Sequence, residues 1–223
     1  AGAERSDLIT TEHFVRACMY VVFDVHENCF SANMDLCKNL NNANSRSAQV
    51  IYHEAGHAVV SEVLNPGSVT IVSVLGGERS VGGMTVYSDL NNKDADPFFL
   101  KIQRIISGLG GMAGVECKFG ITNCGSSEDL YIVFREVYKL ISDDCVWGLS
   151  NYAFGFDDSE HKKHQLEVIS SAQVERYYHK AKEIITQNKE LFEAIAHALA
   201  EKVTITKIDI QKIKKRLAGQ TAA

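Results

Sequence analysis

The chain has 223 residues, of which 45% are apolar, and a formal net charge of -5. This length and apolar content are enough to bury one large core, so we expect a compact domain with a helical extension. The negative charge gives no electrostatic support for binding nucleic acid, which excludes that class of partner from the prediction.

Cysteine usage and hydropathy favour a soluble, intracellular protein. The six cysteines form no C-x-x-C pair, which argues against a cysteine-based metal site and for reduced thiols. No apolar run approaches the roughly 18 residues of a membrane-spanning helix. No charged segment precedes the short apolar run at residues 18–23, so we expect no signal peptide. Membrane association is expected only if the sequence is a fragment of a longer protein.

The first 46 residues are predicted to form an extension to the main domain. Residues 11–37 have the pattern of one or two irregular helices. Residues 39–47 form a polar, asparagine-rich stretch that is typical of a linker or an exposed loop. We therefore place the main domain at residues 47–223.

Residues 47–64 are predicted to form the helix on which the chemistry depends. Apolar residues recur at helical spacing, Ser45 or Ser47 can cap the start, and Asn-Pro-Gly at residues 65–67 can end the helix. Gly56 inside it costs about 1 kcal/mol relative to alanine. Such a glycine suggests that another segment packs very close to the backbone at this point.

The same helix carries His-Glu-Ala-Gly-His at residues 53–57, the H-E-x-x-H (HEXXH) pattern of zinc hydrolases. His53 and His57 are four residues apart, so on a helix they lie one turn apart on the same face and can bind one Zn²⁺. Zinc lowers the pKa of a bound water to about 7, and Glu54 can accept the proton, which yields a hydroxide that attacks a peptide carbonyl. The alternative is a buried amphipathic helix whose histidines bind no metal.

Two short strands are predicted after this helix. Residues 68–75 and 81–87 have strand character and flank a turn-rich gap at residues 76–80, which indicates a β-hairpin. A hairpin of this size is not stable alone, so we expect it to pack on helices.

The rest of the chain is predicted to be helical apart from one loop. The expected elements are a helix over 97–118, a helix over 129–142, a polar loop over 151–164, two long amphipathic helices within 165–217 that divide near 187–188, and a short helix after 206. The glycines at residues 108–114 are expected to allow close contact between helices, and His161 and His164 to be solvated. The predicted fold class is mainly α with one small β-hairpin or sheet (α+β).

Three segments of the chain resemble those of a known family. They read HEAGHAVV at residues 53–60, ISGLGGMAGVECKFG at 106–120 and TNCGSSEDL at 122–130. They are similar to the zinc helix, the L-x-G-G-R-A-A-E-E-x-x-F-G segment and the T-x-G-A-x-N-D-L segment of the FtsH family. These are the membrane-anchored ATP-dependent zinc metalloproteases of peptidase family M41. The similarity covers approximately residues 47–215 and implies an M41-like zinc peptidase fold.

The resemblance also implies a third metal ligand. In the family, the aspartate of the last segment completes the zinc site, and the matching residue here is Asp129. Two histidines and one carboxylate leave a fourth position on zinc for water. Judged without the resemblance, Asp129 fits the start of a helix that Ser126 caps. Glu128 and Glu116 are rival ligands.

The chain departs from the family pattern at three places. Met112 stands where the family has arginine, Val115-Glu116 replaces a pair of glutamates, and Glu128 replaces asparagine. None of these changes removes an expected ligand or the expected base.

The FtsH family also has an ATPase module, but no G-x-x-x-x-G-K-[ST] sequence occurs in this chain. The resemblance is therefore to the peptidase domain without its ATPase module. Because the family assembles through its peptidase domains, usually as six-fold rings, the resemblance implies a homo-oligomer or an ATPase partner.

The second predicted strand is the expected substrate-binding edge. Gly83, Met84, Thr85 and Val86 match the family's strand beside the zinc. Protease clefts commonly bind an extended polypeptide as an added strand at such an edge. An ordinary covered edge strand is equally compatible with the pattern.

These features predict a zinc-dependent metalloendopeptidase that hydrolyses unfolded or flexible polypeptides, with Glu54 as the general base. Two alternatives remain. One is a catalytically degenerate peptidase fold that acts as a binding or scaffold module, which the intact H-E-x-x-H disfavours. The other is a zinc-dependent hydrolase of small amides, which the expected substrate strand disfavours.

Overall fold

The computed structural model describes residues 40–74, 82–88, 97–122, 124–144 and 160–221, together with positions 8–10, 13, 14, 17, 20 and 21. Most of the predicted helices over residues 11–37 and most of the predicted loop over 151–164 lie outside the described residues. The boundary between an extension and a main domain near residue 46 stays a prediction.

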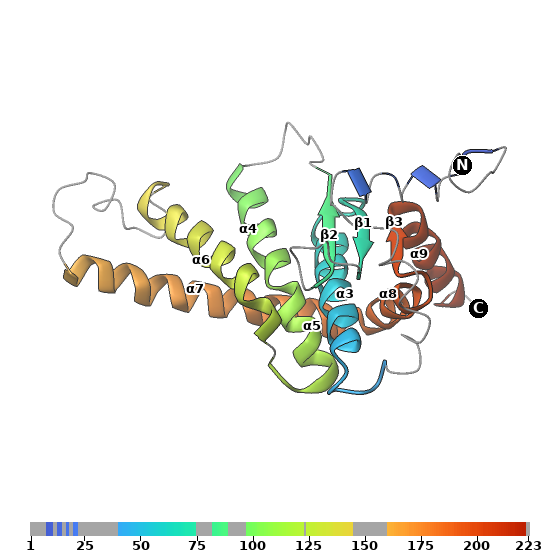
Figure 1. The fold of residues 1–223 in the computed structure, drawn as a ribbon. Coiled ribbons are helices and arrows are strands. Elements are labelled where there is room, and N and C mark those ends of the chain that lie inside the picture. Colours follow the sequence, from blue (N-terminus) through green and yellow to red (C-terminus); the bar gives the residue numbers. More distant parts are fainter. Residues whose placement is uncertain are drawn as a thin grey trace.

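The described residues form a mainly helical structure with one small antiparallel sheet, as predicted (Figure 1). The sheet has the strand order β2-β1-β3, with β1 at Val69–Ser73, β2 at Met84–Tyr87 and β3 at Thr204–Thr206. Val72 of β1 pairs with Thr85 on one side and with Ile205 on the other. The predicted pairing of the first two strands is confirmed, whereas β3 was not foreseen.

The helix α3, Arg46–Leu64, lies at the centre of the structure. The Ser45 side chain accepts a hydrogen bond from the Ala48 amide at 3.3 Å, so the predicted serine cap is confirmed. The helix ends at Asn65, and Gly67 follows with φ of 80°, a value that glycine adopts without strain.

The prediction of one continuous helix over residues 97–118 is wrong. The structure has two helices, α4 at Pro97–Gly108 and α5 at Gly110–Phe119, which meet at Leu109. The neighbouring glycines have low helix propensity, so a turn costs little here. The turn lets α5 pack directly on α3, where a Cβ atom added to Gly56 would lie 2.1 Å from the Gly110 carbonyl oxygen. The predicted role of glycine in close helix contact is thereby confirmed.

The remaining helices surround α3 and the sheet. They are α6 at Ser127–Ser142, preceded by the 3-10 turn η2 at Cys124–Ser126, then α7 at Glu160–Gln187, α8 at Lys189–Lys202 and α9 at Lys207–Thr221. Because α7 begins at Glu160, His161 and His164 lie on a helix and not in the predicted loop, although both are exposed as expected. In Figure 1, α6 lies beside the first half of α7, and α8 and α9 lie next to β3.

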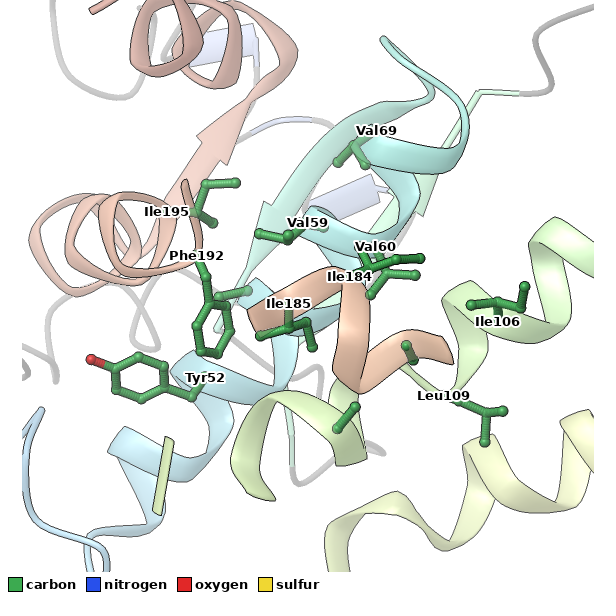
Figure 2. Packing of buried hydrophobic residues seen from close by; sticks show 14 of the residues in the cluster. Tyr52, Val59, Val60, Val69, Ile106, Leu109, Ile184, Ile185, Phe192 and Ile195 are labelled. Carbon is green, nitrogen blue, oxygen red and sulfur yellow. The ribbon is translucent and has the colours of Figure 1, made fainter. Parts of the chain in front are cut away.

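The hydrophobic core joins α3 to its neighbours (Figure 2). Tyr52, Val59 and Val60 of α3 are fully buried, and they pack in one cluster with Ile185 of α7 and Ile195 of α8. A helix that is buried on most of its surface is held rigidly by its neighbours. The histidines of the H-E-x-x-H motif therefore project from the best supported helix of the described structure.

Polar contacts at the edge of the core fix α5 and α8 relative to α3. The Tyr52 hydroxyl donates to Glu193 at 2.7 Å, and Lys118 donates to the same carboxylate at 2.9 Å. The Lys118 ammonium also lies 4.5 Å from the centre of the Tyr52 ring. Within the described ranges, none of the helices has the length and apolarity needed to cross a bilayer.

Candidate metal centre

The fold brings His53, His57 and Asp129 together. The two histidines lie one turn apart on α3, and Asp129 lies in the first turn of α6. The Nε2 atoms of the histidines are 3.0 Å apart, and the Asp129 Oδ2 atom lies 3.0 Å from the first and 3.4 Å from the second. Among the described residues, these three form a group that could hold a metal ion.

The spacing of these three atoms fits a zinc ion. A tetrahedral Zn²⁺ with bonds of about 2.0–2.2 Å would separate neighbouring ligand atoms by roughly 3.3–3.6 Å. The triangle of 3.0, 3.0 and 3.4 Å is close to that size. Two imidazole nitrogens and a carboxylate oxygen are also donor types that zinc favours.

A backbone carbonyl orients one of the histidines. His57 is buried, and its Nδ1 atom lies 2.8 Å from the Ser107 carbonyl oxygen at the end of α4. Because a carbonyl oxygen only accepts, Nδ1 must carry the hydrogen, which leaves the lone pair of a neutral ring on Nε2. Nε2 is the atom that faces His53 and Asp129, so this hydrogen bond aims a ligand atom at the centre.

The electrostatics of the cluster favour a positive charge. Burial alone would raise the pKa of Asp129, but hydrogen bonds from His53 and His57 outweigh it and hold this pKa well below its usual range. Burial alone would lower the pKa of His57, but Asp129 and the charge of Glu54 raise it to about 9. An excess of negative charge around buried imidazoles is the environment that a dication would balance.

Glu54 lies beside the cluster and not in it. Its side chain is buried, and its Oε2 atom accepts a hydrogen bond from the Thr85 hydroxyl at 2.8 Å. Burial raises the pKa of Glu54, against the opposing effects of His57, His53 and the Thr85 hydrogen bond. A carboxylate with a raised pKa is a better proton acceptor, as a general base requires.

Glycines bring the surrounding backbone into contact with these side chains. A Cβ atom added to Gly111 of α5 would lie 2.4 Å from Cε1 of His53 and 2.5 Å from Nε2 of His57. A Cβ atom added to Gly83 would lie 2.5 Å from Cγ of Glu54. Real Cβ atoms do not approach so closely, so glycine at both positions leaves room for the site.

The cluster opens into a cleft of about 1320 Å³ between α3, α4, α6 and the edge of β2. Its lining includes every predicted site residue except Val86: His53, Glu54, His57, Gly83, Met84, Thr85 and Asp129. The strand β2 is an edge of the sheet in the order β2-β1-β3. Three of the four predicted substrate residues and the predicted metal site therefore share one cleft.

Comparison with known proteins places the chain in a family. A family model described as "Peptidase family M41" matches residues 41–213. The chain belongs to peptidase family M41.

Three FtsH proteins illustrate the M41 relatives. The chain is 28% identical over 169 residues to "ATP-dependent zinc metalloprotease FtsH 2" of Thermoanaerobacter sp. (strain X514), a match that covers 73% of this chain and 31% of the relative. It is 30% identical over 182 residues to "ATP-dependent zinc metalloprotease FtsH" of Lactococcus lactis subsp. lactis (strain IL1403), a match that covers 74% of this chain and 26% of the relative. It is 27% identical over 169 residues to "ATP-dependent zinc metalloprotease FtsH 3" of Phytoplasma mali (strain AT), a match that covers 74% of this chain and 27% of the relative.

The M41 match spans about a quarter to a third of the length of these relatives. The expectation of an FtsH-type M41 peptidase domain is confirmed at the level of the family.

The rival ligands lie apart from the group formed by His53, His57 and Asp129. Glu116 accepts hydrogen bonds from Lys182 and Tyr178 of α7. Glu128 is exposed and lines the cleft, outside the group of three. Ser126 stands at the N-cap of α6, but its side chain makes no capping hydrogen bond.

Three contacts of the site were not foreseen from the sequence. They are the Ser107 carbonyl on His57, the Thr85 hydroxyl on Glu54 and the Gly111 backbone against both histidines. Each joins residues that are far apart in the chain, so no local spacing pattern could have revealed it. Gly56 and the glycines at 108–114 were the available signals, because they indicated a close approach without naming its partner.

Proposed function

We propose that this chain is a zinc metalloendopeptidase that hydrolyses peptide bonds of unfolded or flexible polypeptides. One observation carries the proposal. Two imidazole nitrogens and a carboxylate oxygen converge within 4.8 Å of one another in a cleft that also contains the buried carboxylate of Glu54. Membership in peptidase family M41 supports it.

His53, His57 and Asp129 would hold the zinc. These three ligands leave a fourth position open to the cleft, as a catalytic and not a structural zinc site requires. Zinc supplies a Lewis acid there, which makes water acidic and polarises the substrate carbonyl. Asp129 would be the one charged protein ligand, so it would offset only part of the ion's charge and leave the ion able to stabilise a developing oxyanion.

Glu54 would move the proton. In this proposal its carboxylate accepts a proton from the attacking water and returns it to the nitrogen of the leaving amine, so that no net proton is consumed. Its position one residue after His53 sets it at the edge of the metal cluster. Its burial excludes bulk water, which would compete for the same proton.

The edge of β2 would bind the substrate. An extended polypeptide can pair with the backbone of Gly83, Met84, Thr85 and Val86 and so pass across the metal cluster. Backbone pairing depends little on side chains, which suits an enzyme that accepts many flexible sequences. A folded protein cannot present a single extended strand in this way.

The relatives named above are called ATP-dependent. We therefore also propose that the chain acts in an oligomer, or together with an ATPase that delivers unfolded polypeptide to the cleft.

The first prediction tests the general base. Glu54→Gln keeps the shape of the side chain and cannot accept a proton, so hydrolysis of casein should fall by about 10²–10⁴-fold while bound zinc is unchanged. The measurement is metal content together with casein hydrolysis, before and after chelation, for the variant and the original chain.

Near-normal hydrolysis by Glu54→Gln would overturn the assignment of Glu54. Bound zinc without any turnover of casein or peptides in the original chain would favour a scaffold module. Turnover of small amides but not of peptides would favour a small-amide hydrolase.

A further inference from the structure

We propose that Thr85 is a positioning residue, which holds the Glu54 carboxylate in the orientation needed for proton transfer. The inference rests on the proposed function, because it assumes that Glu54 is the general base. The strand β2 would then have two roles: its edge would bind the substrate, and the Thr85 side chain would orient Glu54 of α3.

The contact is direct and short. The Thr85 hydroxyl donates to Oε2 of Glu54 at 2.8 Å, between β2 and α3. Among the hydrogen bonds of the described residues, this is the one that reaches the Glu54 carboxylate. A hydrogen bond from a hydroxyl to a buried carboxylate is among the stronger kinds, because one partner is charged and water is excluded.

Gly83 completes the support from the same side. Gly83 directly precedes β2 and is two residues before Thr85, so extended backbone would turn both residues to the same side. A Cβ atom on Gly83 would lie 2.5 Å from Cγ of Glu54 and 2.9 Å from its Oε1 atom. The backbone of Gly83 thus blocks one direction of side-chain movement, while the Thr85 hydroxyl fixes the rotation of the carboxylate.

This arrangement divides the two carboxylate oxygens between two tasks. Oε2 is held by Thr85, and Oε1 is left to accept the proton from water. A glutamate side chain has three rotatable bonds, so without such a restraint it would spend part of its time in other rotamers. A displacement of about 1 Å at a reacting group can cost on the order of 10²-fold in rate.

The test compares three variants in the whole chain, loaded with zinc. Thr85→Val removes the hydroxyl and keeps the shape, and it should lower kcat for a flexible peptide about 10–100-fold with little change in KM. Thr85→Ser keeps the hydroxyl and should restore most of the rate. Thr70→Val is the matched control, since the Thr70 hydroxyl donates to the Val86 carbonyl of β2 at 2.8 Å without touching Glu54, and it should leave kcat near its original value.

A second readout does not depend on activity. In a crystal structure of Thr85→Val, the Glu54 carboxylate should adopt a different or a mixed orientation, while His53, His57 and Asp129 keep their places. Zinc content should equal that of the original chain, because Thr85 contacts none of the expected ligands.

Three results would overturn the inference. The first is an unchanged kcat in Thr85→Val, the second is a raised KM in Thr85→Val without a fall in kcat, and the third is an equal fall of kcat in Thr70→Val. The second would make Thr85 a substrate contact, and the third would assign the effect to the sheet as a whole. The proposed function would survive each of them as long as Glu54→Gln remains inactive, and it would fail by itself if Glu54→Gln stayed active.

Discussion

At the scale of single residues, the three candidate ligands differ in how firmly they are held. His53 and His57 project from a helix that is buried on most of its surface, and the Ser107 carbonyl fixes the ring of His57. Asp129 lies in the first turn of α6, and its side chain is 30% exposed, against 13% for His53 and 8% for His57. The carboxylate is thus the ligand that the fold restrains least.

The second prediction concerns this carboxylate. Asp129→Ala should lower zinc affinity by more than the roughly 10–100-fold that is typical when a group supporting a ligand is lost. The measurement is metal content after dialysis against a weak chelator. Glu128→Ala and Glu116→Ala are the controls, and both should retain zinc. If Glu128→Ala loses the metal and Asp129→Ala retains it, the assignment of ligands in this loop is wrong by one residue.

At the scale of elements, β3 and the start of α9 are held by one side chain. The Asp209 carboxylate accepts hydrogen bonds from the Thr206 amide and the Thr206 hydroxyl, both at 2.9 Å, and Lys202 of α8 donates to it at 2.6 Å. Thr206 precedes α9 and Asp209 is its third residue, so the bond from the Thr206 amide to the Asp209 carboxylate is one half of a capping box. The short strand that closes the sheet is thereby joined to two helices.

The third prediction tests this cap. Burial alone would raise the pKa of Asp209, but hydrogen bonds from Lys202 and Thr206 hold it below its usual value of 3.8. A carboxyl whose pKa is lower in the folded state stabilises the fold above the unfolded pKa, and it loses this effect as pH falls through the folded pKa. Asp209→Asn should therefore cost about 1 kcal/mol of unfolding free energy at neutral pH.

The difference between Asp209→Asn and the original chain should begin to shrink below about pH 4 and should disappear as pH falls through the lowered folded-state pKa of Asp209, where the carboxyl becomes neutral like the amide. Thermal or urea unfolding at pH 7 and at low pH would measure this. Glu190→Gln, an exposed acidic residue in the first turn of α8, is the control and should change stability little. A difference that grows in acid would contradict the assigned role of Asp209.

The sequence predicted elements that carry their own local signals. The helix α3 has apolar residues at helical spacing, a capping serine and a terminal Asn-Pro-Gly, so its bounds were predicted to within one residue. The predicted division near residues 187–188 is also correct, since α7 ends at Gln187 and α8 begins at Lys189. The Asn188 side chain donates to the Ile184 carbonyl and so caps the end of α7. In contrast, β3 has three residues and shows no readable alternation. The break at Leu109 depends on how α5 packs on α3, which no local pattern contains.

In the candidate site, too, the sequence predicted what local spacing determines and missed what tertiary contacts determine. The spacing of His53 and His57 predicted their shared face, since four residues make about one turn of a helix. Asp129 is 72 residues beyond His57, so only the family resemblance suggested it. Thr85 was predicted as part of a substrate strand, and its contact with Glu54 is a tertiary contact that alternation along a strand does not specify.

At the scale of the whole molecule, the size of the cleft suits an extended polypeptide segment and not a folded domain. It runs between α3, α4, α6 and the edge of β2, and its volume of about 1320 Å³ is enough for several residues of extended polypeptide but not for a folded protein. Under the proposed function, a substrate would have to be unfolded before it reached the candidate metal site.

The fourth prediction follows from the energy that unfolding requires. Unfolding a stable domain costs about 5–15 kcal/mol, and this sequence has no G-x-x-x-x-G-K-[ST] motif with which to bind a nucleotide. The chain should hydrolyse casein and leave a stable folded reporter intact, with or without ATP. The test incubates each substrate with purified chain, zinc and ATP. ATP-dependent loss of the reporter would show that a nucleotide-binding element is present and was missed.

The unequal burial of the ligands also determines how an ion would exchange with solvent. The two histidines belong to a helix that is packed into the core, whereas the third candidate ligand begins a helix with one exposed face. Local opening of the first turn of α6 would release the carboxylate while both imidazoles stay in place. How long His53, His57 and Asp129 stay together as a site for an ion would then depend on fraying at one helix end and not on the global stability of the fold.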